Sequence, residues 1–479
     1  MSMPFPFTDR NPYLEGIFAP VKAETSATDL PVIGRLPDDL AGMFIRNGSN
    51  PRFSPIGRYH WFDGDGMVHG LQFEGGRASY RNRYVRTEAL AAEEAAGQAL
   101  SKGILESPDF RRKGGPFKDT ANTDLTFHDG KLLALWWLGG ACYEIALPSL
   151  DTVGIRDFKD ASGAGLRKGL SAHPKIDPKT GEMMFFDHSI TPPHLTYGVI
   201  SATGQIVNKI DVDLPGARLQ HDMAITEHHS ILFDFPLLWD PELLARGKTR
   251  VRFNRDLPAR FGILPRMGKA SDIRWFEASS CYMYHSINAW ESGDEIILVG
   301  CRIENPLPGP ENRSKPLPRL DILELEPYLH EWRFNLVTGA VTERKLDDVM
   351  TEFPRMNNEV LGRPSHYSYN PRIAPAEELL YDGVIKYDTD SGAKWEFVYG
   401  EGRYGGETTF APARGAKSED DGYVLTFLHD LKEDRSELLV FDAKAVSDGP
   451  VARVLLPSRV PAGYHSWWVD EARLNASAI

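Results

Sequence analysis

The sequence predicts an all-β fold of the propeller type, and three observations support this prediction. Short apolar or alternating runs of about four to eight residues recur along the chain, and each is closed by a turn. The 479 residues include 43 Gly and 34 Pro, a composition rich in turn formers. Four histidines with strand-like neighbours are spread over most of the chain, and they can meet only at the centre of a closed, repetitive fold.

The strand-like runs combine β-branched, aromatic and aliphatic residues and are bounded by Asp, Gly or Pro. The clearest are residues 131–137, 182–186, 295–300, 422–428, 437–441 and 451–456. Asp129-Gly130, directly before the first of them, is a typical hairpin turn. No exact internal repeat is visible, so the pattern of strands and turns, and not a measured period, favours the propeller.

Two segments are predicted to be helices inserted on this β framework. Residues 87–102 are rich in Ala and Glu, with Thr87 as the N-cap and Gly103 as the stop. Residues 240–247 start with Asp240 as the N-cap and a proline at the first helical position. No linker, low-complexity tract or change of composition divides the chain, so residues 1–479 are expected to form a single domain.

Charge and composition exclude several classes of function. A net charge of -13 argues against nucleic acid as a partner, because nucleic-acid binding needs a basic surface. The three cysteines are expected to be reduced and buried. The N-terminus has no basic region followed by an apolar stretch, and no run approaches the roughly 18 apolar residues of a spanning helix. A cytoplasmic protein acting on a neutral or apolar small molecule is expected.

The four histidines are the strongest chemical signal. They are His173, His221, His285 and His465. Neutral imidazole is a good ligand for iron, copper or zinc. On a propeller the first three would lie on successive blades, and the inner strands of the blades converge on the axis. The sequence therefore predicts a metal site built from histidine alone.

Composition by itself cannot select four histidines from the 14 in the chain. By default the others are expected at the surface or in ordinary hydrogen bonds: His60, His69, His128, His188, His194, His228, His229, His330, His366 and His429. His285 and His465 lie in apolar, aromatic stretches, where an imidazole without a partner is costly. This context favours them as ligands.

Several motifs, in order from about Pro12 to Asp470, resemble the carotenoid cleavage oxygenases. Besides the four histidine contexts, they are Arg46-Asn-Gly-Ser-Asn-Pro51, Tyr59-His-Trp-Phe-Asp-Gly-Asp-Gly-Met67, Thr120-Ala-Asn-Thr123, Arg274-Trp-Phe276, Glu352-Phe-Pro354, Gly400-Glu-Gly-Arg-Tyr-Gly405 and Arg459-Val-Pro-Ala-Gly-Tyr-His465. The resemblance implies a seven-bladed β-propeller with a loop and helix dome over one face. It also implies O2-dependent cleavage of a carbon–carbon double bond into two carbonyl products.

In such proteins the four histidines bind Fe(II), and three glutamates orient three of the imidazoles by accepting their free N–H groups. By resemblance, Glu352 and Glu407 are two of these glutamates. The third glutamate of the family follows an Ala-Leu-Trp segment, but here Trp137 follows Trp136. Glu144 is too far along the chain to be a good substitute. Two interpretations stay open: one imidazole bonds a backbone carbonyl or water in place of the carboxylate, or the alignment with the family slips locally. If the carboxylate is missing, weaker iron binding is expected.

The resemblance assigns Thr123, Trp136, Tyr284 and Phe353 to the substrate pocket. Thr123 is expected beside an open position of the metal, and the three aromatic residues are expected to be walls for a planar polyene; the alternative for them is ordinary core packing. The segment Phe235–Leu244 is expected to line a tunnel entrance, to contact a membrane surface peripherally, or to form a buried corner.

An apocarotenoid-like polyene is the favoured substrate, with O2 as the second. Stilbene-cleaving members hold the phenol with a lysine near the position of Trp136 and a tyrosine from an upstream loop, and residues 103–110 contain no tyrosine. Cleavage of a stilbene or a related aromatic alkene is the alternative within the family. Outside it, two hypotheses remain: a non-catalytic propeller that binds a partner, and a hydrolase using Asp63, Asp65 and Asp222.

Overall fold

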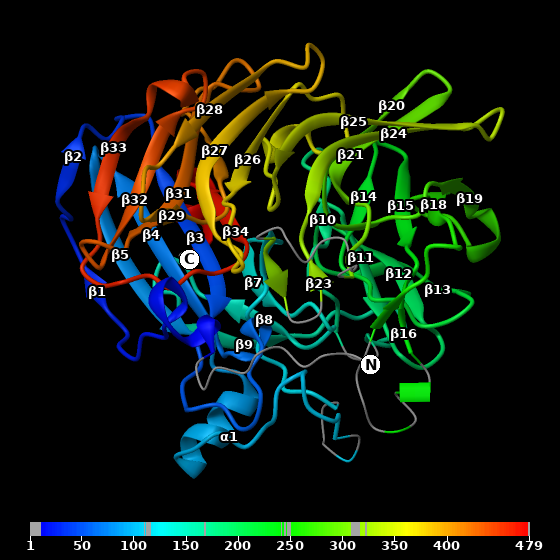
Figure 1. The fold of residues 1–479 in the computed structure, drawn as a ribbon, viewed down its shortest axis with the longest axis horizontal. Coiled ribbons are helices and arrows are strands. Elements are labelled where there is room, and N and C mark those ends of the chain that lie inside the picture. The colour runs from blue at the N-terminus through cyan, green and yellow to red at the C-terminus, as the bar shows by residue number, and fades with distance from the viewer. Residues whose placement is uncertain are drawn as a thin grey trace.

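The protein is all-β in its computed structural model, with few helices at the periphery (Figure 1). The structure describes residues 11–109, 111, 116–166, 169–240, 242–243, 246, 251–307, 317–320 and 323–477. No helix within these residues is long and apolar enough to cross a membrane.

Four of the sheets are four-stranded and antiparallel, with strands that follow one another closely in the chain. The first contains β6 (Asp124–His128), β7 (Lys131–Leu135), β8 (Cys142–Ile145) and β9 (Thr152–Arg156); the second contains β10 (Lys175–Ile176), β11 (Met183–His188), β12 (Leu195–Ile200) and β13 (Ile206–Val212). The third contains β14 (Met223–Ile225), β15 (His229–Asp234), β18 (Ala259–Pro265) and β19 (Arg274–Ala278); the fourth contains β20 (Tyr282–Ser292), β21 (Glu295–Ile303), β24 (Pro327–Asn335) and β25 (Val341–Met350).

Two larger sheets complete the β framework. One joins the two ends of the chain in the order β1 (Ser26–Ala27), β5 (Arg77–Tyr84), β4 (Gly66–Glu74), β3 (Gly42–Ser49) and β34 (Ser466–Asp470). The other has nine strands: β2 (Val32–Gly34), β33 (Pro450–Leu455), β32 (Arg435–Asp442), β31 (Gly422–Asp430), β29 (Arg403–Gly405), β27 (Tyr381–Asp388) and β26 (Tyr367–Ile373) in order, with β28 (Lys394–Val398) on β27 and β30 (Thr409–Pro412) on β31. Two small ribbons are formed by β16 (Leu237–Trp239) with β17 (Val251–Phe253), and by β22 (Arg319–Leu320) with β23 (Leu323–Glu324).

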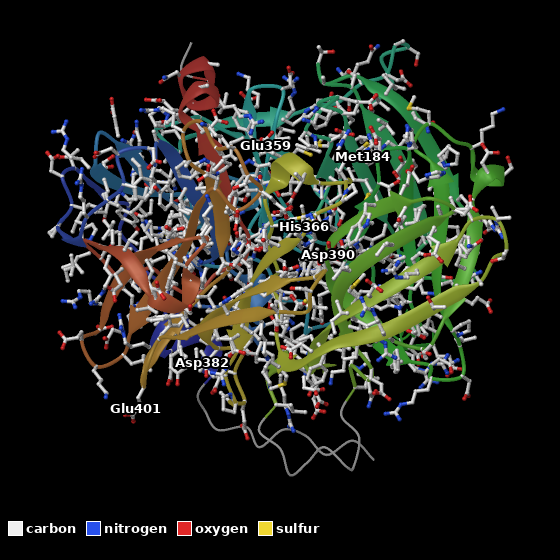
Figure 2. The ribbon with its side chains drawn as sticks, turned by 90° about the horizontal axis from the view of Figure 1, so that it is seen from above. Met184, Glu359, His366, Asp382, Asp390 and Glu401 are labelled. Carbon is white, nitrogen blue, oxygen red and sulfur yellow. The ribbon has the colours of Figure 1, made fainter. Side chains whose placement is uncertain are left out.

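Neighbouring sheets contact one another through a few pairs of strands. β14 contacts both β11 and β20, β25 contacts β26, and β34 contacts both β30 and β6. An isolated bridge between Trp136 and Ser171 links the end of β7 to the segment before β10. Seen from above, the sheets from the two ends of the chain lie on one side and those of the middle third on the other (Figure 2). The strands that begin the sheets therefore lie toward the middle of the molecule.

The predicted strands are confirmed, with ends shifted by a few residues. Residues 131–137 contain β7, which ends at Leu135, and residues 182–186, 295–300, 422–428, 437–441 and 451–456 fall on β11, β21, β31, β32 and β33. Asp129 and Gly130 both have positive φ, 49° and 69°, as a two-residue hairpin turn requires. Cys142, Cys281 and Cys301 are free and buried, as expected.

The first predicted helix is real but shorter than expected. α1 (Glu88–Ala96) begins after Thr87, whose hydroxyl accepts from the backbone N–H of Leu90. It ends at Gly97 and not at Gly103, because Gly97 adopts a left-handed conformation and its N–H bonds the carbonyls of the last turn. Residues 240–247 lie partly outside the described residues. A second helix, α3 (Glu471–Ser477), ends the described chain.

Candidate metal centre and its cavity

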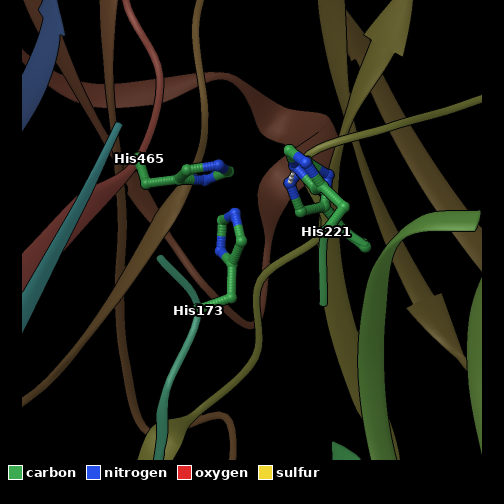
Figure 3. Close-up of side chains that lie close together, drawn as sticks. His173, His221 and His465 are labelled. Carbon is green, nitrogen blue, oxygen red and sulfur yellow. Dashed lines mark hydrogen bonds between the residues drawn. The ribbon is translucent and has the colours of Figure 1, made fainter. Parts of the chain in front are cut away.

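The four predicted histidines lie together where strands of four different sheets begin. His173 precedes β10, His221 precedes β14, His285 lies in β20 and His465 precedes β34. Their ligand atoms all lie within 4.8 Å of one another, and all four side chains are buried. Figure 3 shows His173, His221 and His465 converging, with a dashed line at the contact between His221 and His285.

Local backbone features aim these side chains at a common point. His173 has a positive φ of 67°, a conformation that L-residues rarely adopt, and its N–H donates to the Asp124 carboxylate at 2.9 Å. The pairing of β20 with β21 is irregular between Met283 and Ser286, which brackets His285. Such irregularities redirect a side chain that a regular strand would point elsewhere.

The imidazoles face one another through their Nε2 atoms. Nε2 of His221 and Nε2 of His285 are 3.2 Å apart. Nitrogens bound at a right angle to one ion, each about 2.1 Å away, lie roughly 3 Å apart. Nε2 of His173 is buried and has no hydrogen-bond partner among the described residues. A bound cation would satisfy this atom.

The electrostatics of the cluster keep the rings of His173, His221 and His465 neutral. Burial, followed by the neighbouring imidazoles, lowers the pKa of His173 and of His221 well below the usual value. Burial, followed by His285, does the same to the pKa of His465. Neutral imidazole is the form that binds a metal, so the arrangement favours a cation over protons.

Two carboxylates hold two of the rings from behind. Glu352 Oε2 lies 2.5 Å from Nδ1 of His285, and Glu407 Oε1 lies 2.8 Å from Nδ1 of His465. Glu407 is itself positioned by Ser466, whose N–H and hydroxyl donate to it at 2.5 and 2.7 Å, and by the Arg355 guanidinium at 2.8 Å. The predicted positions of Glu352 and Glu407 beside ligand histidines thus match the geometry.

Of the two remaining rings, His173 has its Nδ1 3.7 Å from Asp124 Oδ2, whereas His221 has no carboxylate neighbour among the described residues. Its Nδ1 is buried and has no hydrogen-bond partner in the described part of the chain. The Trp137 ring lies 6.4 Å from it between centroids, and the Tyr284 ring packs edge-on at 4.9 Å. A tryptophan therefore stands beside the imidazole that lacks its partner, at the sequence position where the resemblance expects a glutamate.

An apolar cavity of about 450 Å³ opens onto the cluster; we call it the inner cavity. Its lining includes His221, His285, His465, Thr123, Trp137, Tyr284 and Phe353, together with Trp61, Phe62, Leu320, Leu325, Glu352, Leu379, Tyr381 and Tyr464. Thr123, Tyr284 and Phe353 thus lie where the sequence predicted the pocket. The shape and apolar character suit a hydrophobic ligand held beside the histidines.

Of the four residues assigned to the substrate pocket, Trp136 is the one that does not line the inner cavity, where Trp137 stands instead. Both residues follow β7, at a turn in which the Gly139 N–H donates to the Trp136 carbonyl at 3.1 Å. The Trp137 N–H donates to the Thr123 hydroxyl at 3.2 Å, which fixes the segment next to the cavity. Trp136 is buried in the core, only 6% exposed.

A second cavity of about 680 Å³, the outer cavity, adjoins the first. The two share Phe62, Trp137, His221, Tyr284 and Leu320. Trp239 and Val251 line only the outer one, so part of the segment Phe235–Leu244 does border a path toward the cluster. Phe235 and Leu237 are buried at 5% and 0% exposure, as in a buried corner, and Leu244 lies outside the described residues.

Other residues of the site were not predicted from the sequence. Asp124 holds the backbone of His173, Trp137 borders both cavities, and His60 lines the outer cavity. His60 was placed with the ordinary hydrogen-bonded histidines, although it sits inside the Tyr59–Met67 motif, which was the available signal. The aspartates of the hydrolase hypothesis have structural partners: Asp63 caps the turn Trp61–Asp63, Asp65 pairs with Lys118, and Asp222 pairs with Lys175 and Ser286.

The buried His60 gives a testable pH dependence of stability. Burial lowers its pKa from 6.5 to about 3 in the folded protein. The unfolded chain therefore takes up this proton first, so stability is lost as the pH falls below about 6.5, by up to about 1.4 kcal/mol per pH unit. The free energy of unfolding, measured in urea, should fall more steeply between about pH 7 and pH 5 for the wild type than for His60→Ser. Parallel pH profiles would contradict this assignment.

Comparison with known proteins agrees with this geometry. Residues 18–470 match the model of the retinal pigment epithelial membrane protein family, RPE65. The chain belongs to the RPE65/carotenoid cleavage oxygenase family. Within this family, it is 39% identical to a carotenoid 9,10(9',10')-cleavage dioxygenase of Crocus sativus, over 97% of this chain and 90% of the relative.

Two solved structures of carotenoid cleavage oxygenase relatives share the fold. The lignostilbene dioxygenase of Pseudomonas brassicacearum superposes with a TM-score of 0.85 at 28% identity, covering 98% of this chain and 100% of that one. A mutant of the Synechocystis apocarotenoid oxygenase gives a TM-score of 0.82 at 27% identity, covering 94% of this chain and 97% of that one. The family scaffold is therefore present over nearly the whole chain.

Proposed function

We propose that the protein is a non-haem Fe(II) enzyme that uses O2 to cleave a carbon–carbon double bond of an apocarotenoid-like polyene into two carbonyl products. The observation that carries this proposal is the four-histidine cluster at the end of an apolar cavity. Relatives named as carotenoid cleavage dioxygenases support the reaction class. The products account for both oxygen atoms of O2, since each carbon of the broken bond gains one.

The donor set fits iron. His173, His221, His285 and His465 offer neutral nitrogen ligands, with Nε2 of His173 lacking any other partner among the described residues. Glu352 and Glu407 would fix two rings in the tautomer that leaves Nε2 free for the metal. Fe(II), when bound there, supplies the redox chemistry with O2.

The chain's own residues would position the alkene and keep the site dry. Phe353 packs on both His285 and His465, at 5.0 and 4.8 Å between ring centroids, and forms an apolar wall next to them. Tyr284 covers His221. The Thr123 hydroxyl donates to Asn122 at 3.0 Å and is thereby held in the lining, where its methyl group would restrict access to the metal.

A polyene suits the lining better than a phenol does, because the inner cavity carries little polar surface apart from the histidines and Glu352. Trp136 and Trp137 stand in the segment where a stilbene enzyme of the family has its phenol-binding lysine, and neither is basic. Cleavage of an aromatic alkene such as a stilbene is the second candidate. The TM-score of 0.85 to a lignostilbene dioxygenase favours it.

We further propose that the sheets form the seven blades of a closed propeller. The nine-stranded sheet divides after β29 into two blades: one contains β26 to β29, and the other contains β30 to β33 with β2 at its edge. The four four-stranded sheets and the five-stranded sheet supply the other five blades. The contacts of β34 with β6 and with β30 support closure at the ends of the chain. The loops around α1 and the β16–β17 ribbon would form the dome.

A lipophilic alkene and O2 are the proposed partners, and the outer cavity is the proposed entry path. Trp239 and Val251 border it. A peripheral membrane contact near Phe235–Leu244 would use the half-buried Leu238 and Trp239, since Phe235 and Leu237 face the core. Such a contact would let the substrate pass from a lipid surface into the path.

Substrate incubations test this proposal. Iron-loaded protein is incubated with an apocarotenal and, separately, with a hydroxystilbene, each in air and under argon, and the aldehydes are separated and identified. Aldehyde formation from the apocarotenal in air alone is expected. Faster cleavage of the hydroxystilbene would favour the second candidate, and no cleavage of either would contradict the enzymatic role.

A further inference from the structure

His60 presents a single fixed hydrogen-bond donor to the outer cavity. It is the residue before the turn Trp61–Asp63, and its Nδ1 accepts the backbone N–H of Phe62 at 3.0 Å. Because Nδ1 is the acceptor, the one proton of the neutral ring resides on Nε2. Burial keeps the ring neutral, since it lowers the pKa of His60 to about 3.

The His60 ring is held firmly in this orientation. The backbone N–H of His60 donates to Asp63 at 2.8 Å, and the Phe62 ring packs edge-on against the imidazole at 4.7 Å between centroids. His60 is only 7% exposed and lines the outer cavity, and Nε2 has no hydrogen-bond partner within the described residues. With Nδ1 turned toward the backbone, Nε2–H is the group available to a ligand.

The surroundings of this donor select the kind of atom it can bind. Ile104, Leu105, Phe117 and Leu138 make this part of the outer cavity apolar. A buried N–H without an acceptor is costly, so a ligand oxygen that accepts from it gains free energy. The described lining contains no Lys or Arg, and burying an ionised carboxylate beside a neutral donor is unfavourable. A neutral oxygen acceptor fits.

The outer cavity adjoins the inner cavity, which opens onto the histidine cluster. It shares Phe62, Trp137 and His221 with the inner cavity, which reaches the histidine cluster. An elongated ligand that occupied both cavities would place its double bond at the cluster and its far end beside His60. The N–H of His60 would then lie away from the double bond that is cleaved and would bind only the far end of the ligand.

We propose that His60 Nε2–H binds a neutral acceptor oxygen at the end of the substrate that occupies the outer cavity, so that the enzyme selects an aldehyde or ketone over the corresponding hydrocarbon or acid. This proposal deepens the proposed function and rests on it. A phenolic oxygen presents the same acceptor chemistry. His60 is thus a residue for substrate specificity.

The test measures binding separately from turnover. Quenching of tryptophan fluorescence in metal-free protein gives the dissociation constants of an apocarotenal, the acid of the same chain length, a hydrocarbon polyene of similar length and a hydroxystilbene. His60→Ser keeps an oxygen to cap the turn but cannot reach the cavity with a donor, whereas His60→Asn keeps both a cap and an N–H. Thermal unfolding confirms that each variant folds.

Wild-type protein is expected to bind the aldehyde more tightly than the hydrocarbon or the acid. His60→Ser should weaken binding of the aldehyde by about 5- to 10-fold, leave the hydrocarbon unchanged and raise KM far more than it lowers kcat. The loss of affinity for the aldehyde should be smaller in His60→Asn. A loss of affinity confined to the hydroxystilbene would overturn the assignment of an aldehyde or ketone and identify a phenol as the ligand of His60.

Equal affinity of the wild type for the aldehyde and the hydrocarbon would overturn the proposal without recourse to any variant. An equal loss of affinity for the aldehyde and for the hydrocarbon in His60→Ser would overturn the proposal as well. Failure of the proposed function shows differently, because selective binding of the aldehyde without any O2-dependent cleavage would leave the role of His60 intact.

Discussion

Replacement of His285 by alanine is expected to abolish both metal binding and cleavage. His285 lies between His221 and His465 in the cluster, with ring centroids 4.9 and 4.7 Å away, and Glu352 holds it from behind. Its loss removes one ligand and leaves the Glu352 carboxylate buried without its imidazole. Because removing even an outer partner of a ligand costs about 10- to 100-fold, a ligand itself should cost at least 100-fold in affinity and activity.

His366→Ala is the matched control for this experiment. His366 is an exposed histidine that pairs with Asp390 at the surface, 2.9 Å away, and Figure 2 shows both residues. Metal content, measured by atomic emission, and aldehyde formation should match the wild type in His366→Ala and fall to background in His285→Ala. Full metal content and full activity in His285→Ala would rule out the four-histidine centre.

Replacement of Trp137 by glutamate is expected to tighten metal binding by about 10- to 100-fold. Nδ1 of His221 is buried, and no described residue accepts its proton. A carboxylate at position 137 would accept this proton, orient the ring and raise its basicity, as Glu352 and Glu407 do for His285 and His465. Anaerobic competition of Fe(II) or Co(II) against a chelator of known affinity measures the gain.

Trp137→Phe separates this electrostatic effect from the loss of the indole. Phenylalanine keeps an aromatic wall but provides no acceptor, so its metal affinity should stay close to that of the wild type. Glutamate and phenylalanine variants with equal affinity would contradict the assignment of Trp137 as the residue that leaves His221 without a partner. Because glutamate is smaller than tryptophan, this variant should also enlarge both cavities at position 137. A change in KM for the substrate would report this.

The sequence allowed the centre to be predicted because its residues lie in distinctive local contexts. The four histidines and Glu352 and Glu407 lie at the starts of strands or in the segments between them, and the topology brings them together as expected. The missing carboxylate was also visible, since Trp137 stands where the family places a glutamate. The structure adds that His221 is the ring affected.

Features that depend on the backbone path of a few residues could not be predicted from the sequence. Which of Trp136 and Trp137 faces the cavity depends on where β7 ends, and a shift of one residue reverses the outcome. α1 ends at Gly97 because that glycine is the first one able to adopt the left-handed conformation, so the later Gly103 has no role in stopping it. The position of His60 depends on one hydrogen bond in a short turn.

X-ray absorption at the iron edge, together with metal content, tests the central claim most directly. We expect about one iron per chain, bound by four imidazole nitrogens at about 2.1 Å with no protein carboxylate in contact. No uptake of iron after anaerobic reconstitution, or an iron bound through carboxylate oxygens of the protein, would contradict it.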